Sequence, residues 1–240
     1  MSIFDHLEEL RQRIIKSIIV VCTSIILSFL FIKPLVSFLE IPAKSITLVQ
    51  LSPGEFLFVS LKIAGYSGLI FSLPYIISQI IFFISPGLTN KEKKLILPAT
   101  LGSGVLFFVG LFFSWWVLIP AAINFFIRFG EDVVQSAWSI ERYFDFVLLL
   151  MSSTALAFQL PVLQFILGTL GIITAEKMTN NWRPVVIFAA ILSAILTPST
   201  DPLTMTLLTI SLIILFFIGI LLIKTSKILF KVETPSSFHQ

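Results

Sequence analysis

The stretch IIKSIIVVCTSIILSFLFI, residues 14–32, decides what kind of protein this chain is. Lys16 is its only charged residue, and most of the others are aliphatic or aromatic. An α-helix needs about 20 apolar residues to cross the hydrocarbon core of a bilayer, and this run has that length. We therefore predict that residues 14–32 form a transmembrane helix.

The composition of the whole chain agrees with this prediction. Of its 240 residues 57% are hydrophobic and 12% are charged, and 25 are Phe. That balance exceeds what a soluble domain can bury, so we expect an integral membrane protein in contact with the lipid bilayer. The net charge of +3 does not indicate a nucleic-acid partner, because the basic residues lie at the ends of apolar runs.

Six apolar runs predict an all-α protein with six transmembrane helices in one membrane domain, residues 1–240. The runs cover residues 14–32, 56–84, 95–127, 144–173, 185–196 and 203–223, and a short cytosolic tail, 224–240, follows. Prolines within or near the ends of these runs predict a kinked bundle: Pro74, Pro98, Pro120 and Pro161. The fifth run reaches only ~18 Å, so the fifth helix is expected to be short. Together with the tight link TPSTDP, the last two runs either cross separately or form a shallow hairpin.

The distribution of Lys and Arg predicts the orientation. If both termini lie on one side, that side collects most of the 16 bases: Arg11, Arg13, Lys16, Lys91, Lys93, Lys94, Lys177, Arg183, Lys224, Lys227 and Lys231. By the positive-inside rule, the termini and the KEKK loop face the cytoplasm, or the stroma in a plastid.

Two segments on that side hold carboxylates among bases. In HLEELRQR, residues 6–13, Glu9 and Arg13 have i,i+4 spacing, which predicts an exposed helical ion pair worth about 0.3–0.5 kcal/mol. In SPGLTNKEKKLILP, residues 85–98, Glu92 fits the first turn of a helix. These local roles account for both acids. A second explanation is a surface for a basic peptide, because a planar guanidinium pairs well with a carboxylate.

Two polar residues fall inside the predicted spans. Gln159 lies near the middle of the fourth span and is followed by Pro161. We expect its amide to hydrogen-bond to a neighbouring helix, to backbone freed by the proline, or to water. Lys62 is close enough to the outer end of its helix to snorkel to the interface, and we assign it no chemical role.

Charged residues also stand at the predicted outer ends of helices. Glu141, Arg142 and Asp145 open the fourth span, where acids are favoured near a helix N-terminus. Asp201 lies in the outer TPSTDP turn and is expected to cap the last helix.

The sequence offers no pattern for catalysis, a cofactor or a metal. It has no phosphate-binding glycine loop, its single cysteine has no companion, and His6 and His239 stand at opposite ends of the chain. We therefore expect no enzyme, and the absence of intramembrane histidine disfavours a redox-complex subunit.

Four stretches, in order and at matching spacing, make the chain resemble the TatC family, the multispanning receptor subunit of the twin-arginine protein translocase. They are FDHLEELRQR, FISPGLTNKEKK, ALAFQLPV and ILTPSTDPLTM. The resemblance implies that the N-terminus and the first cytosolic loop bind twin-arginine signal peptides of folded cargo proteins. By motif position, Glu9 and Glu92 would engage the paired arginines, whereas Glu8 is not fixed by the motif. Neighbours implied in the same surface are Leu10, Arg11, Phe83 and Pro86.

The resemblance also implies roles elsewhere in the chain. Gln159 corresponds to a membrane-embedded polar residue, often glutamate, on the concave face of the family's bundle. Glu141, Arg142 and Asp201 are assigned to outer-side assembly. The family's short fifth and sixth helices thin the membrane and contact TatB-like and TatA-like single-span subunits, although the sixth run here looks longer than that pattern.

Two functions remain to be compared. The first is a receptor and core subunit of an oligomeric twin-arginine translocation complex, in which partner subunits draw on the proton gradient. The alternative is a small ion or solute carrier with a polar midplane site, in which Gln159, Lys62 and the proline kinks line a pathway. We expect a plastid thylakoid membrane, or the cytoplasmic or thylakoid membrane of a cyanobacterium.

Overall fold

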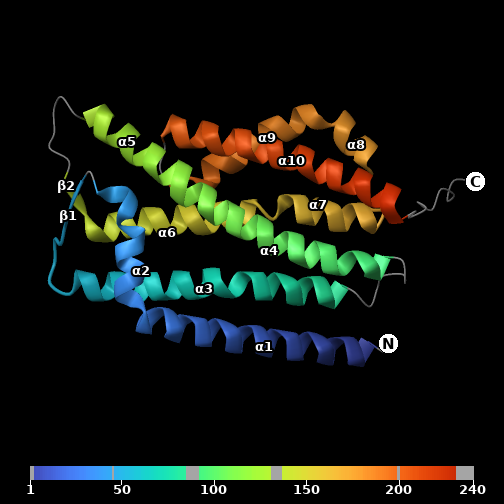
Figure 1. Cartoon of the computed structure of the whole chain (residues 1–240), viewed down its shortest axis with the longest axis horizontal. Helices are drawn as coiled ribbons and strands as arrows, with labels where there is room; N and C mark the ends of the chain where they lie inside the picture. The colour runs from blue at the N-terminus through green and yellow to red at the C-terminus, as the bar shows by residue number, and fades with distance from the viewer. Residues whose placement is uncertain (1–2, 45, 85–91, 131–136, 199–200, 231–240) are drawn as a thin grey trace, which may run out of the picture.

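The computed structural model describes residues 3–44, 46–84, 92–130, 137–198 and 201–230. Long helices run side by side along the length of the molecule (Figure 1). The helices are α1 (Ile3–Leu30), α2 (Ile32–Leu39), α3 (Glu55–Ile84), α4 (Ile96–Phe113), α5 (Ile119–Gly130), α6 (Ile140–Ala157), α7 (Leu160–Thr169), α8 (Ala175–Asn180), α9 (Trp182–Leu196) and α10 (Pro202–Phe230).

The start of α1 and the end of α10 lie at the same end of the bundle, which we call the inner end (Figure 1). The C-terminus of α3 and the N-terminus of α4 are also there. The opposite, outer end carries α2 and the two short strands β1 (Thr47–Val49) and β2 (Ala137–Ser139). The elements are therefore arranged as expected for a chain whose termini lie on one side of a membrane.

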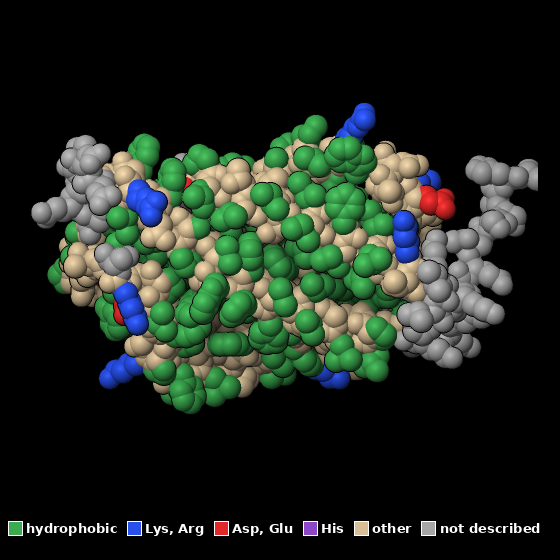
Figure 2. Space-filling view, turned by 45° about the horizontal axis from the view of Figure 1, so that its top comes forward, with side chains coloured by type: hydrophobic (Ala, Val, Ile, Leu, Met, Phe, Trp, Pro, Cys, Tyr) green, Lys and Arg blue, Asp and Glu red, His purple; other side chains and the backbone are tan. Residues whose placement is uncertain are grey.

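Five helical stretches in the described residues are long and apolar enough to cross a membrane, and a shorter apolar helix accompanies them. They are Phe4–Leu30, Glu55–Ile84, Ile96–Gly130, Ile140–Thr169 and Pro202–Thr225, with Trp182–Leu196 as the shorter one. This confirms the predicted all-α membrane fold with a short fifth helix. The last helix, α10, has 29 residues, so of the last two predicted helices only α9 is short. Hydrophobic side chains cover the flank of the molecule, and basic ones lie mostly toward its two ends (Figure 2).

Two of the long stretches are bent, and proline explains both bends. A π-helical turn, Ser114–Leu118, separates α4 from α5 directly before Pro120. Proline has no backbone N–H, so a carbonyl one turn earlier lacks its usual donor. A wider turn of this kind accommodates that gap. The fourth stretch breaks between α6 and α7, where Pro161 occupies the first turn of α7. The predicted kinked bundle is confirmed.

The outer end contains structure that the sequence did not predict. Strands β1 and β2 pair in parallel, with Leu48 opposite Trp138. Helix α2 crosses the outer end of α3 (Figure 1). It is held by Tyr143 of α6, whose hydroxyl donates a hydrogen bond of 2.6 Å to the carbonyl of Leu39.

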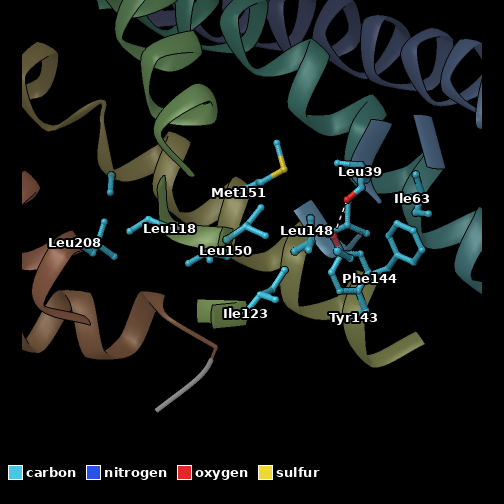
Figure 3. Close-up of a cluster of buried hydrophobic side chains, with 14 of the residues drawn as sticks. Leu39, Ile63, Leu118, Ile123, Tyr143, Phe144, Leu148, Leu150, Met151 and Leu208 are labelled. Atoms are coloured by element: carbon cyan, nitrogen blue, oxygen red, sulfur yellow. Dashed lines mark hydrogen bonds between the residues drawn. The ribbon is translucent and has the colours of Figure 1, made fainter. Parts of the chain in front are cut away.

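The main core lies where α3, α5, α6 and α10 meet in the outer half of the bundle (Figure 3). Tyr143, Phe144, Leu118 and Leu208 are nearly inaccessible there. In the α6–α7 stretch 61% of the span is buried inside the protein, against 6% for α1. Helix α1 therefore stands at the edge of the bundle and depends on α3 for its position.

Candidate functional site

At the inner end, α1 and α3 are joined by a polar chain of three side chains. Arg13 donates to Glu9 Oε1 from Nε at 2.9 Å and from Nη2 at 2.6 Å. The third nitrogen, Nη1, donates to Oε1 of Gln79 on α3 at 2.8 Å. The predicted ion pair of Glu9 with Arg13 is confirmed, but it is not exposed as predicted, because the two side chains are only 21% and 24% exposed. Its further link to Gln79, which sequence reasoning missed, also fixes the guanidinium against the next helix.

The second carboxylate oxygen of Glu9 has no hydrogen-bond partner among the described residues, although it is buried. Its neighbour His6 lies 3.9 Å away, measured from Nδ1, which is too long for a hydrogen bond. An unsatisfied buried acceptor typically costs about 1–3 kcal/mol. One carboxylate oxygen of Glu9 therefore lacks a hydrogen bond, while the other accepts from Arg13.

The ring of His6 lies beside this position and stacks on Phe83 near the end of α3. The two ring centroids are 4.3 Å apart and the planes differ by 14°. The side chain of His6 is 44% exposed, and that of Glu9 beneath it is 21% exposed. The structure therefore brings Glu9 and Phe83, both predicted site residues, against one imidazole ring.

The neighbouring pair Glu8 and Arg11 is different. These side chains are 49% and 69% exposed and form an ion pair at 3.4 Å. Exposed pairs of this kind contribute little to stability. The structure places Arg11 in this solvent-exposed pair, apart from the Arg13 contact to Glu9. The two adjacent glutamates therefore occupy distinct environments.

An apolar groove of about 420 Å³ runs between α1 and α3 from this polar chain toward the middle of the bundle. Leu10 and Phe83 line its inner end, so these two predicted residues share one surface. The remaining predicted residues are Glu92 and Pro86. Glu92 begins the short 3-10 turn Glu92–Leu95 ahead of α4, but its side chain lies outside the described part of the chain, and so does Pro86.

Gln159 lies at the break between α6 and α7, and it is bonded to α4. Its Oε1 accepts a hydrogen bond from Ser103 Oγ at 2.8 Å, and its Nε2 donates to the Ser103 carbonyl at 3.2 Å. The predicted interhelical bonding is confirmed. An amide suits this position because it both accepts and donates.

Lys62 was expected to reach the outer interface, and the sequence assigned it no partner there. Its ammonium group donates to Glu141 Oε1 at 2.7 Å and to Asp145 Oδ1 at 2.9 Å. Two acids on α6 lie within reach because α6 packs beside α3, a contact with no signal in the sequence. Glu141 and Arg142 lie in the first turn of α6, as expected for residues that open the fourth span.

Two further acids organise the outer end. Asp201 Oδ1 accepts from the backbone N–H of Thr204 at 2.7 Å, which confirms that it caps α10. Sequence reasoning missed Glu55, which is 4% exposed. Its carboxylate accepts from Ser139 Oγ at 2.9 Å and from the N–H of Ser52 at 3.0 Å, so it ties the start of α3 to the start of α6. Within the described residues, no three His, Cys, Asp or Glu gather in a way that could hold a metal ion.

Comparison with known proteins identifies the family. The profile described as "Sec-independent protein translocase protein (TatC)" matches residues 5–211. The chain belongs to the TatC family. A TatC protein from the cyanobacterium Synechocystis is 54% identical over 92% of this chain and 87% of its own length. The chloroplastic protein of Pisum sativum is 51% identical over 93% of this chain, which spans 64% of the pea protein.

A solved structure supports the same family. The crystal structure described as the twin arginine translocase receptor TatC superposes with a TM-score of 0.79 at 33% identity, covering 92% of this chain and 99% of that one. This member of the TatC family is therefore a multi-pass membrane protein of protein translocation, and its family is not one of enzymes. Its relatives come from cyanobacteria and chloroplasts, in line with the expected location.

Proposed function

We propose that this chain is the signal-peptide receptor of a twin-arginine translocase, with its inner end facing the cytoplasm or stroma. In this proposal Glu9 and Glu92 bind the paired arginines of the signal peptide, and Leu10, Arg11, Phe83 and Pro86 surround them. The observation that carries the proposal is the buried, unpartnered Oε2 of Glu9. A guanidinium supplies the donor that this oxygen lacks.

The surroundings of Glu9 favour a cationic ligand with an apolar continuation. Arg13 occupies Oε1, and Gln79 holds Arg13, so the carboxylate is fixed in position before a ligand arrives. The groove that begins beside Leu10 is almost entirely apolar. A peptide with arginines followed by apolar residues matches both features. Preorganisation of this kind lowers the entropy cost of binding.

The carrier alternative has less support. Gln159 uses both its amide groups on Ser103, and Lys62 is held by two acids. The polar groups of both side chains are therefore already hydrogen-bonded in this structure, whereas Glu9 Oε2 lacks a hydrogen-bond partner among the described residues.

We further propose that single-span TatB-like and TatA-like subunits dock on the exposed, lipid-facing side of α9 within an oligomeric complex. We also propose that Glu141, Arg142 and Asp201 support assembly at the outer end of the bundle. Helix α9 has 15 residues and so reaches about 22 Å, less than the ~30 Å of a bilayer core. Its exposed stripe contains Ile187, Ile191 and Ile195. A partner helix there would cover apolar surface where the bilayer must thin.

The test is peptide binding by the purified protein in lipid nanodiscs. Glu9→Gln is expected to weaken an Arg-Arg signal peptide by about 10-fold or more, since a charge-assisted contact is worth about 1.5–3 kcal/mol. Glu8→Gln is the matched control, because it removes the neighbouring acid, which is already paired in solvent. Equal affinity of the two variants, both folded, would remove Glu9 from the site and refute the proposal.

A further inference from the structure

The stacked pair His6 and Phe83 lies beside the buried Oε2 of Glu9, which has no hydrogen-bond partner among the described residues. The imidazole is a flat, nitrogen-bearing ring, parallel to the Phe83 ring to within 14° and with Nδ1 3.9 Å from Glu9 Oε2. It thus lies against an aromatic face and a carboxylate at the same time. A guanidinium is also planar, stacks on aromatic rings and pairs with carboxylates.

We propose that His6 is an internal stand-in for an arginine of the bound peptide, and that binding exchanges the imidazole for a guanidinium stacked on Phe83 and paired with Glu9. This inference rests on the proposed function of the inner end. It adds two statements: Phe83 is a residue that selects arginine over lysine, and His6 closes the site when no peptide is present.

The imidazole and a guanidinium fit this position differently in one respect. At 3.9 Å the imidazole leaves Glu9 Oε2 without a hydrogen bond. A guanidinium carries five N–H donors in a fixed fork and supplies that bond without disturbing Arg13, which binds the other oxygen. The exchange therefore replaces an incomplete contact by a complete one.

The position of His6 permits the exchange. It lies in the first turns of α1, which begins at Ile3, and its side chain is 44% exposed. Glu9 and Arg13 lie one and two turns further along the helix, where Gln79 anchors them. The ring can turn away into solvent while the carboxylate stays fixed.

Lysine fits the same position less well. Its ammonium group is a compact, strongly hydrated charge that lacks the flat face needed to lie against Phe83. A Lys-Lys peptide would keep attraction to Glu9 and lose the stacking. Truncation of Phe83 should therefore affect the Arg-Arg peptide alone.

The first experiment measures binding of Arg-Arg and Lys-Lys signal peptides to Phe83→Leu and Phe82→Leu in nanodiscs. Phe82 is the matched control, since it is the adjacent phenylalanine and is exposed. Phe83→Leu is expected to weaken the Arg-Arg peptide about 3- to 5-fold and to leave the Lys-Lys affinity unchanged. An equal loss for both peptides would overturn the stacking role. If neither peptide responds to Phe83→Leu while Glu9→Gln still weakens Arg-Arg binding, the stand-in proposal fails and the proposed function survives.

The second experiment observes His6 directly. The chain has 2 histidines, so histidine-labelled protein gives simple NMR spectra of the imidazole groups. Addition of the Arg-Arg peptide should move the His6 signals out of the ring-current field of Phe83, and the Lys-Lys peptide should do so much less. Persistence of the stacked signals at saturating peptide would contradict the exchange.

Affinity provides the complementary readout. His6→Ala opens the site and is expected to raise Arg-Arg affinity about 2- to 5-fold, whereas Gln12→Ala, an exposed change on the same helix, should not. Loss of affinity in His6→Ala would show that His6 holds the peptide, which is the opposite of the proposed role.

Discussion

Glu55 should be the most sensitive single side chain at the outer end. It is 4% exposed, and its two oxygens divide four donors between them. Oε2 accepts from the N–H groups of Leu51 and Ser52, while Oε1 accepts from Ser139 Oγ and more weakly from the N–H of Glu141 at 3.4 Å. One carboxylate therefore links the loop before α3, the end of β2 and the start of α6.

The informative change is Glu55→Gln, which preserves shape. An amide offers one oxygen and no charge. Turned to keep the N–H groups of Leu51 and Ser52, it places its NH2 beside Ser139 Oγ, which can accept, and against the N–H of Glu141, so three bonds lose their charge and the fourth is lost. Hydrogen bonds to charged groups are worth about 1.5–3 kcal/mol, and the weakest of these four is long, so a loss of about 3 kcal/mol is expected. For a chain of this length each kcal/mol lowers Tm by about 2–4 °C, which gives a decrease of roughly 6–12 °C.

The assay is thermal unfolding in detergent, with Glu40→Gln as the control. Glu40 is an acid at the same end of the molecule, and no described residue donates a hydrogen bond to its side chain. Signal-peptide binding at the inner end should remain unchanged in both variants at low temperature. A Tm for Glu55→Gln equal to that of Glu40→Gln would show that the four bonds do not stabilise the outer end.

Two further predictions concern helix contacts. A Cβ on Gly68 of α3 would lie 2.6 Å from the Cα of Ile25 on α1, whereas one on Gly65 would meet nothing within 4 Å. Gly68→Ala should push α1 away, destabilise the protein by about 1–3 kcal/mol and weaken peptide binding, and Gly65→Ala should leave thermal unfolding and affinity unchanged. Photo-crosslinking in native membranes should capture a single-span subunit from Ile191 on α9 and not from Leu101 on α4, which is also exposed; equal capture would contradict docking on α9.

Local and periodic features of the site were predictable. The i,i+4 spacing gave the Glu9–Arg13 pair, and the turn sequence gave the Asp201 cap. Pro120 and Pro161 predicted the two interruptions, because the missing donor acts on its own helix, whereas α3 continues through Pro74. The partner of Gln159 could be predicted as a class, another helix, but not as Ser103. Gln79 gave no signal, since a glutamine near the end of an apolar helix has many ordinary explanations.

The sequence by itself determined which segments cross the membrane, because a bilayer demands length and apolarity from each helix separately. Only the tertiary structure decided which polar groups meet. Lys62 binds Glu141 and Asp145, and Arg13 binds Gln79. Strand β1 pairs with β2, and all of these partners are far apart in the sequence. Such contacts depend on which helices pack together and how far each is rotated. Lipid-facing and buried helix faces are both apolar in a membrane protein, so composition does not record that rotation.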